Sequence, residues 1–577
     1  MHPNPAETSS CSRRDFFVAV AATGAAASGT ALAHALPQSA AAASAPPDGI
    51  TPASIAEAEK FVGIAFTPKE RDQMVRSIAD QIATFRSRQP FGALANDLAP
   101  AQVFSVMLPG ETVPPPSEAA EEPARALAPA PNSDADLDFA TVEQLGAWMR
   151  AGKVTSRQLV ERSIARLRKA NATLFNVITL IEAPALAEAD ARDAEMREGN
   201  SRGPLHGIPY GLKDLFDTAG IATTWGAEPW RDRVPTSDAS VVARLRDAGA
   251  VCVAKTAVGA LAYGDIWFGG TCRNPWNPEQ GSSGSSAGSA SAVAAGCVPF
   301  AIGTETLGSI VSPSVRCGTT GLRPTFGRVP RDGAMALCWS WDKVGPITRS
   351  VLDTGFVLEA IHGANDADPS SVTQPFTAPT RAAMRGLRLA YDPAWLAGGG
   401  ESRQSPFAEA LDAARACGAE LVERTITPPA APSLLVTSLM SEAAAAFEEM
   451  TRSNADDQLS WQADEAWPNS FRQTWFVPAI ELVQAERLRR VFMRWMREVL
   501  AGVDAVIAPP FAGGLLVVTN ATGHPTLCMR SGFDSPNTPR STCLIGHPFD
   551  ETTLVRAGAA LEARLAVAEK RPEMPWM

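Results

Sequence analysis

Apolar and polar residues follow two different patterns along the chain. Between residues 52 and 88, apolar side chains recur every three or four positions, which predicts a small helical extension. Thr67 followed by Pro68 is typical of a helix start, because the hydroxyl can cap the first turn and proline fits the first helical position. A proline-rich stretch over residues 109–135 predicts a linker or a chain that runs over the surface.

From residue 138 onward, short apolar runs alternate with helical stretches. Two amphipathic helices are predicted between Phe139 and Ala170. Buried strands are predicted for Ala248–Ala254, Val298–Ile302, Leu387–Tyr391 and Ala505–Ala508. This alternation predicts an α/β fold, a single large α/β/α sandwich around a mixed, twisted sheet formed by residues 138–577. The flexible segment, helical extension and linker ahead of it are expected to span residues 36–137.

The first 35 residues have the organisation of an export signal. Arg13 and Arg14 precede a Phe-Phe pair, and an Ala/Gly/Val stretch follows, as in a twin-arginine signal peptide. The alternative is a disordered alanine-rich tail. No later stretch has the roughly 18 uninterrupted apolar residues of a membrane span, so no membrane anchor is expected. We therefore expect a periplasmic or secreted protein, cleaved after Ala33 or Ala35.

Composition and charge narrow the classes of partner. The chain has 577 residues, of which 45% are hydrophobic, and a net charge of −11. Without a basic surplus to neutralise phosphates, nucleic acid is not an expected partner, whereas a homodimer stays open. The nine cysteines show no metal-ligand spacing, and no metal or other cofactor is expected. An oxidising compartment would permit disulfides. Because twin-arginine cargo folds before export, the eight cysteines after Cys11 are instead expected to be buried free thiols.

One lysine stands out against a chain that uses arginine for most of its positive charge. Lys213 follows the apolar run Ile208–Leu212, which predicts a buried strand. Burial disfavours the charged amine, and a fall of about three units from a pKa of about 10.4 would make Lys213 a base near neutral pH. Pairing with Asp214 or Asp217 would instead make it structural. Lys255 has a similar apolar lead-in and is interpreted as structural.

Two serine-containing segments complete the candidate chemistry. Residues 281–291, Gly-Ser-Ser-Gly-Ser-Ser-Ala-Gly-Ser-Ala-Ser, form a tight loop that suits a proton relay and an anion-binding rim. The loop lacks the Gly-Lys-Ser/Thr of a phosphate-binding loop. In residues 303–310, Gly-Thr-Glu-Thr-Leu-Gly-Ser-Ile, small residues before Ser309 let backbone amides converge on one oxygen. The histidines after the signal all have structural explanations, so lysine is the available base.

These segments resemble the amidase signature family, serine hydrolases with a Ser–cis-Ser–Lys triad. The resemblance runs from about residue 138 to 570 and rests on six segments in the family's order: 205–214, 283–290, 303–310, 317–325, 345–350 and 519–525. Counting back from Gly303 without a gap places Ser285 on the cis-serine. Placing Ser282 there instead would require a three-residue insertion.

The resemblance implies a role for each site residue. The catalytic residues would be Ser309 as nucleophile, Ser285 as proton shuttle and Lys213 as base. The Gly284–Ser285 peptide would be cis, and Ser286 would support the relay by hydrogen bonds. The oxyanion hole would be formed by the backbone amides of Thr306, Leu307, Gly308 and Ser309.

The sequence departs from the family at several positions near Ser309. Leu307 stands where the family usually has glycine, so a positive φ there would strain the backbone. Glu305 replaces the usual aspartate, and Ala287 replaces another glycine. Val311 stands where many members have arginine, with Arg316 five residues on.

The expected function is an exported amidase that cleaves a small carboxamide through an acyl-enzyme. One alternative is an amidotransferase A-like subunit that acts on charged tRNA, against which the acidic charge and the export signal argue. The other is a non-catalytic binding relative. A group of aromatic residues could line an apolar acyl site or belong to the core: Trp461, Trp467, Phe471, Trp475 and Phe476.

Overall fold

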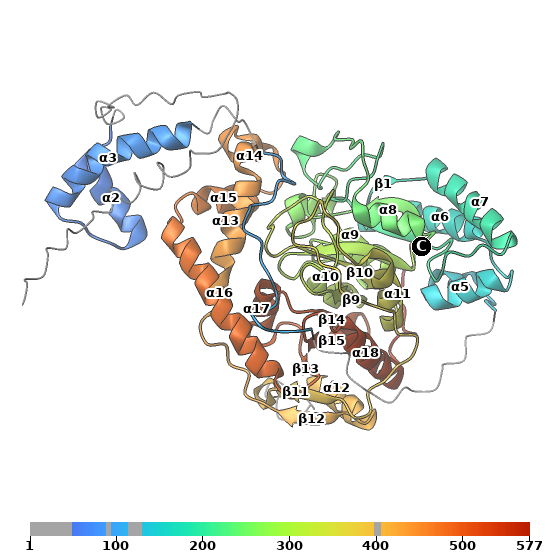
Figure 1. The fold of residues 1–577 in the computed structure, drawn as a ribbon. Coiled ribbons are helices and arrows are strands. Elements are labelled where there is room, and N and C mark those ends of the chain that lie inside the picture. Colours follow the sequence, from blue (N-terminus) through green and yellow to red (C-terminus); the bar gives the residue numbers. More distant parts are fainter. Residues whose placement is uncertain (1–48, 88–93, 114–129, 397–405) are drawn as a thin grey trace, which may run out of the picture. The chain divides into compact units, whose positions relative to one another are not determined.

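The computed structural model describes residues 49–87, 94–113, 130–396 and 406–577 (Figure 1). They fall into two compact units that divide between Pro90 and Phe91. The expected export signal over residues 1–35 lies outside the described residues, as does most of the proline-rich linker.

The first unit consists of a pair of helices, α2 (Pro52–Val62) and α3 (Pro68–Arg86). Each begins with a capping box, at Thr51 and Thr67, followed by proline in the first turn. The Arg71 guanidinium lies 2.7 Å from the Glu59 carboxylate and ties the two helices together. The helical extension and its start at Thr67-Pro68 are therefore confirmed.

The second unit is built on a mixed sheet that has eleven strands in the described part of the chain. In spatial order these strands are β1 (Val177–Leu180), β3 (Val251–Thr256), β2 (Pro209–Lys213), β8 (Phe300–Glu305), β10 (Lys343–Thr348), β9 (Thr320–Arg323), β14 (Thr526–Ser535), β15 (Thr538–Gly546), β13 (Ala505–Ala508), β11 (Arg388–Tyr391) and β12 (Glu420–Glu423). Strand β2 runs parallel to both β3 and β8, whereas β10 is antiparallel to β8 and β9. Two small ribbons lie outside this sheet, β4 (Ile266–Trp267) with β5 (Gly270–Thr271) and β6 (Arg273–Asn274) with β7 (Asn277–Gly281).

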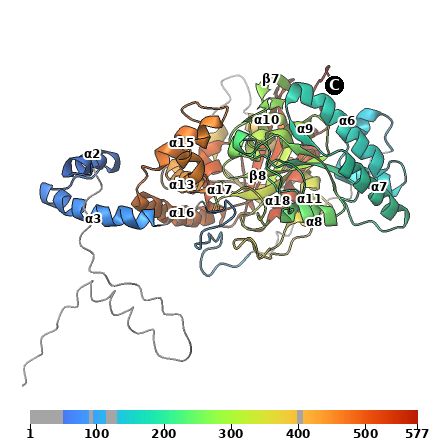
Figure 2. The ribbon, with the colours of Figure 1, turned by 90° about the horizontal axis from the view of Figure 1, so that it is seen from above.

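Helices cover both faces of the sheet (Figures 1 and 2). One face carries α6 (Ser156–Leu174), α7 (Ala183–Arg197), α9 (Ala287–Ala294) and α10 (Val311–Cys317). The other carries α8 (Ser240–Asp247), α11 (Val351–Ile361), α12 (Pro406–Ala416) and α18 (Glu551–Leu565). The predicted α/β/α sandwich is confirmed.

A further group of helices packs together beside the sheet, and Figure 1 shows most of it in orange. It comprises α13 (Val436–Ala446), α14 (Glu448–Arg452), α15 (Trp467–Thr474), α16 (Ala479–Leu500) and α17 (Leu515–Thr522). Two short helices, α4 (Asp134–Asp138) and α5 (Val142–Arg150), precede α6. We call residues 94–113 the strap; Val106 and Leu108 of the strap are buried in the second unit.

Side-chain alternation in β2 and β8 positions the site. Tyr210 and Leu212 of β2 enter the larger core cluster, as do Phe300 and Ile302 of β8. Because the two strands are parallel, their carboxyl ends meet at the same edge of the sheet. Lys213 therefore ends β2 close to the segment where β8 gives way to the Ser309 loop.

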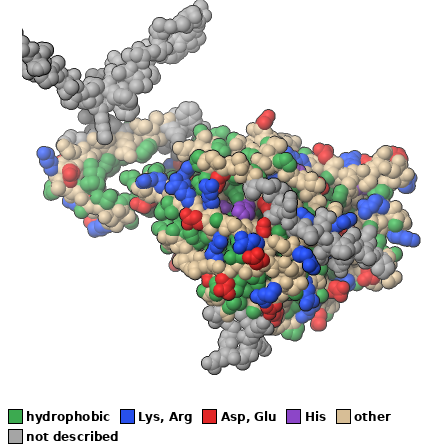
Figure 3. All heavy atoms as spheres, turned by 60° about the horizontal axis from the view of Figure 1, so that its bottom comes forward, with side chains coloured by type: hydrophobic (Ala, Val, Ile, Leu, Met, Phe, Trp, Pro, Cys, Tyr) green, Lys and Arg blue, Asp and Glu red, His purple; other side chains and the backbone are tan. Residues whose placement is uncertain are grey.

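The structure also bears on two further expectations, that the cysteines are free thiols and that no later segment spans a membrane. The eight cysteines after Cys11 are free, six of them buried and two, Cys252 and Cys417, half-buried, which confirms the expected free thiols. Within the described ranges, no helix combines the length and the apolar character that a bilayer crossing needs. On the face shown in Figure 3, acidic and basic side chains are intermixed.

Candidate active site

Lys213 is fully buried at the end of β2, and its amine is held by three oxygen atoms. The Nζ atom lies 2.8 Å from Ser285 Oγ and 2.8 Å from Thr304 Oγ1. The carbonyl oxygen of Thr304 lies 3.4 Å away. An uncharged amine has two N–H donors and one lone pair, so donation to the two Thr304 oxygens leaves the lone pair for the Ser285 hydroxyl.

Burial also sets the protonation state of Lys213. Loss of hydration lowers the pKa of its amine to about 7, although the charges of Asp342 and Glu305 favour the protonated form. Lys213 forms no ion pair with any described residue. Asp214 lies 3.3 Å from the buried Lys255 amine instead, and Asp217 pairs with Arg233. The structure thus removes the pairing that would have made Lys213 structural, and it confirms the structural interpretation of Lys255.

The serine loop carries Ser285 to the lysine through a tightly packed turn. The Gly284–Ser285 peptide is cis, as the resemblance implied. A Cβ atom on Gly284 would lie 1.8 Å from the Gly264 carbonyl oxygen, so only glycine fits there. Ser286 bridges to the neighbouring strand, since its Oγ donates to the Thr304 carbonyl at 3.1 Å and accepts from the Thr304 amide at 3.2 Å.

Ser309 lies between β8 and α10, and the backbone links it to the serine loop. The Ser286 amide donates to the Ser309 carbonyl at 3.1 Å. The positive φ in this turn falls at Gly308, at 82°, and Leu307 has none. The strain considered for a leucine at position 307 therefore does not arise. The amides of Leu307, Gly308 and Ser309 donate to no other group in the described part of the chain, which leaves them free for a ligand oxygen.

A buried carboxylate fixes the shape of the Ser309 turn. Glu305 accepts hydrogen bonds from the amides of Ile310 and Val311 at 2.7 and 2.8 Å. It also pairs with Arg323 at 2.7 Å and accepts from Asn520 Nδ2 at 2.7 Å. Although burial opposes ionisation, the Arg323 charge and these hydrogen bonds hold the pKa of Glu305 below its usual value. The glutamate thus forms the N-terminal anchor of α10.

Both loops open onto a cavity of about 700 Å³. The two loops contribute Ser283, Gly284, Thr306, Leu307, Gly308 and Ser309 to its lining, and α10 contributes Ser312. The apolar wall comes largely from the helices beside the sheet and includes Leu337, Val436, Leu439, Met440, Trp467 and Leu516. The charged side chains of its lining are Asp265, Arg316 and Glu465. The cavity thus joins a polar floor around Ser309 to an apolar wall.

The five aromatic residues considered for an acyl site in the sequence analysis have different positions in the structure. Trp467 lines the cavity, and Trp461 packs on Tyr263, another lining residue, with ring centroids 5.0 Å apart. Phe471 belongs to the core, and Trp475 and Phe476 are exposed. One of the five therefore forms part of the cavity wall.

Sequence reasoning did not assign two groups that contact the site. Thr304 supplies two of the three oxygens around Lys213. The sequence could have indicated this, because Thr304 lies two residues after Ile302 in β8 and so shares its face of the strand. Asp342 accepts a hydrogen bond from Thr306 Oγ1 at 2.5 Å. It lies in an irregular loop, where the sequence pattern gives no signal. No histidine lines the cavity, and no metal-binding cluster of His, Cys, Asp or Glu occurs among the described residues.

The chain matches a protein family over most of its second unit. The family model described as Amidase matches residues 158–555. An amidase of Pseudomonas putida is 34% identical over 472 residues, which covers 75% of this chain and 98% of that protein. A glutamyl-tRNA(Gln) amidotransferase subunit of Anaeromyxobacter dehalogenans is 32% identical over 485 residues, which covers 75% of this chain and 97% of that protein.

Solved structures share the fold of the second unit. The peptide amidase from Stenotrophomonas maltophilia has a TM-score of 0.66 and 30% sequence identity. The match covers 77% of this chain and 99% of that one. The strap lies ahead of the residues that the family model matches.

Proposed function

Because this chain belongs to the amidase signature family, we propose that it is an exported amidase that hydrolyses a linear carboxamide through Ser309, Ser285 and Lys213. The observation that carries the proposal is the buried Lys213 amine, with a pKa of about 7, at 2.8 Å from Ser285 Oγ. Near neutral pH a large fraction of this amine is uncharged and can accept a proton. The family supports cleavage of an amide C–N bond in general.

In the proposed acylation step, Lys213 takes the proton of Ser285 while Ser285 takes that of Ser309. The Ser309 oxygen attacks the amide carbonyl carbon, and the C=O bond becomes an oxyanion. The free amides of Leu307, Gly308 and Ser309, with that of Thr306, stabilise this charge. Collapse breaks the C–N bond, and the leaving amine receives its proton back from Lys213 through Ser285.

Deacylation uses the same relay in the same order. A water molecule gives its proton through Ser285 to Lys213 and attacks the acyl-enzyme ester. The ester C–O bond breaks, and Ser309 is reprotonated as the carboxylic acid leaves. A hydroxyl between amine and nucleophile serves both half-reactions with little side-chain movement.

The cavity supports an apolar acyl group on the substrate. Its wall of leucine, valine, methionine and tryptophan side chains would bury such a group beside Ser309. A carboxamide with a medium-sized hydrophobic acyl chain or ring fits this lining.

The test uses purified protein and a library of amides and esters. Hydrolysis is expected for apolar acyl amides, and Ser309→Ala and Lys213→Ala are each expected to lower turnover by more than a thousandfold. A fluorophosphonate probe should label Ser309 in the wild-type chain. Full turnover in either variant would overturn the triad, and no labelling of the wild type would favour a non-catalytic binding protein.

Similarity to amidotransferase subunits supports a second candidate, a subunit that acts on charged tRNA. That function requires partner subunits, so stable co-purification with them and with tRNA would favour it. The proposed export distinguishes the two, because charged tRNA is a cytoplasmic substrate. Export predicts a mature N-terminus after Ala33 or Ala35, measurable by mass spectrometry of the periplasmic fraction.

A further inference from the structure

The strap, residues 94–113, forms hydrogen bonds with the irregular loop of residues 331–342. The Asn96 side chain makes two hydrogen bonds with the backbone of Ala336. Its Nδ2 donates to the Ala336 carbonyl at 2.9 Å, and its Oδ1 accepts from the Ala336 amide at 2.7 Å. Trp339 Nε1 donates to the Asn96 carbonyl at 3.1 Å. One residue of the strap thus satisfies three polar groups of this loop.

A second strap residue supports the same loop through an arginine. The Phe104 ring lies 3.5 Å from the centre of the buried Arg489 guanidinium. Arg489 donates to the hydroxyl of Ser340 at 2.9 Å and to its carbonyl at 2.6 Å. The strap therefore contacts the 331–342 loop directly at Ala336 and Trp339 and indirectly at Ser340.

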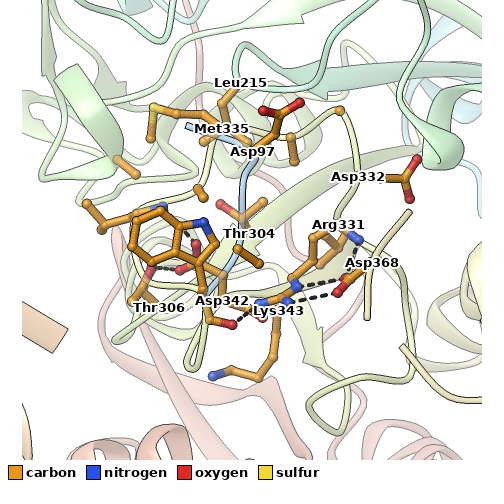
Figure 4. Close-up of a pocket in the computed structure, with 18 of the residues that line it drawn as sticks. Asp97, Leu215, Thr304, Thr306, Arg331, Asp332, Met335, Asp342, Lys343 and Asp368 are labelled. Carbon is orange, nitrogen blue, oxygen red and sulfur yellow. Dashed lines mark hydrogen bonds and ion pairs between the residues drawn. The ribbon is translucent and has the colours of Figure 1, made fainter. Parts of the chain in front are cut away.

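The 331–342 loop in turn contacts the proposed oxyanion hole through Asp342. Asp342 accepts hydrogen bonds from the amides of Leu337 and Cys338 at 2.8 and 3.0 Å. Its other carboxylate oxygen accepts from Thr306 Oγ1 (Figure 4). Leu337 also lines the main cavity. A shift of the loop at Ala336 would therefore move both a wall of the cavity and the carboxylate that holds Thr306.

A small cavity of about 120 Å³ separates the strap from the lysine site. Asp97 of the strap lines it together with Thr304, Thr306 and Asp342. Thr304 is the residue whose hydroxyl and carbonyl face the Lys213 amine. The strap thus lies one cavity width from the residues that surround the proposed base.

We propose that Asn96 is a positioning residue for amide hydrolysis, which fixes the 331–342 loop so that Asp342 holds Thr306 in the oxyanion hole. This inference rests on the proposed function. It assigns a role to a segment that precedes the residues matched by the family model.

The test compares Asn96→Ala with Gln102→Ala in the full chain. Gln102 is exposed on the strap, so its variant controls for a general disturbance of this segment. Asn96→Ala is expected to lower kcat about tenfold and the rate of fluorophosphonate labelling equally, with KM changed less than threefold. Gln102→Ala is expected to retain wild-type kinetics. Thermal unfolding of both variants checks that they are folded.

A double-mutant comparison separates positioning from a general loss of structure. Asp342→Asn alone is expected to lower kcat, and adding Asn96→Ala to it should lower kcat less than twofold further, because both act on Thr306. Effects that multiply, or an Asn96→Ala variant with wild-type kcat, would overturn the inference. If wild-type Ser309 is not labelled at all, the proposed function and this inference both fall.

Discussion

At the scale of single residues, the site depends on the protonation state of the Lys213 amine. Asp214, the residue after Lys213, pairs with the buried Lys255 of the neighbouring strand β3. Lys213 itself has hydroxyl and carbonyl oxygens around its amine and no ion-pair partner among the described residues. Desolvation lowers the pKa of Lys213 to about 7. A lysine that loses its proton on folding near neutral pH destabilises the folded state, because the unfolded chain keeps the amine charged up to a pKa of about 10.4.

Replacement of Lys213 by methionine should therefore stabilise the protein while it abolishes activity. At pH 7 and below, the gain in free energy of unfolding is expected to be on the order of 4 kcal/mol. The folded pKa lies below the unfolded value, so the gain should shrink as pH rises from about 7 and be largely gone near pH 10. Urea denaturation of wild type and Lys213→Met at pH 7 and pH 9 measures this difference. If the difference in free energy of unfolding between the two proteins is the same at pH 7 and pH 9, Lys213 is charged in the folded protein.

At the scale of elements, the turn from β8 to α10 is organised by Glu305. Its carboxylate receives two backbone amides from the start of α10 and the charge of Arg323 from β9. The family usually has aspartate here, and the longer glutamate still makes all these contacts. The buried pair joins the Ser309 turn to β9, which is separated from β8 by β10 in the sheet, so this turn depends on contacts distant in sequence.

Glu305→Gln should destabilise the protein by about 3–5 kcal/mol, because it leaves the buried Arg323 without a counter-charge. The same change should lower kcat, since the amides of Ile310 and Val311 lose the carboxylate that fixes the turn. Glu279→Gln, at an exposed acid, is the matched control and should change stability by less than about 0.5 kcal/mol. Chemical denaturation checks both variants, and equal stability would remove Glu305 from this role.

At the scale of the whole molecule, the sequence predicted what depends on local pattern. The helices of the extension and the alternation of strands and helices follow from periodicity. The placement of Ser285 beside Lys213 was implied by the resemblance to the amidase signature family. Strand ends were misplaced where polar residues continue the ladder, as in β8, which extends past Ile302 to Glu305. The polar end of a strand that pairs on both sides has no hydrophobic signature.

Contacts between distant segments could not be predicted from the pattern. Asp342 reaches Thr306 from an irregular loop, and Asn96 reaches Ala336 across 240 positions. The strap gave no signal because its few buried side chains are interspersed among exposed ones. Only the folded chain shows which aromatic residues line the cavity and which lie on the surface.

The measurement that tests the account most directly is the pH dependence of Ser309 acylation. With a fluorophosphonate probe or an apolar amide, the second-order rate should rise with pH through an apparent pKa near 7 and then level off, because only the uncharged Lys213 amine accepts the proton. The Lys213→Ala variant should be slow at every pH and show no such rise. A wild-type rate that is constant across this range, or that rises only near pH 10, would contradict an uncharged buried lysine as the base.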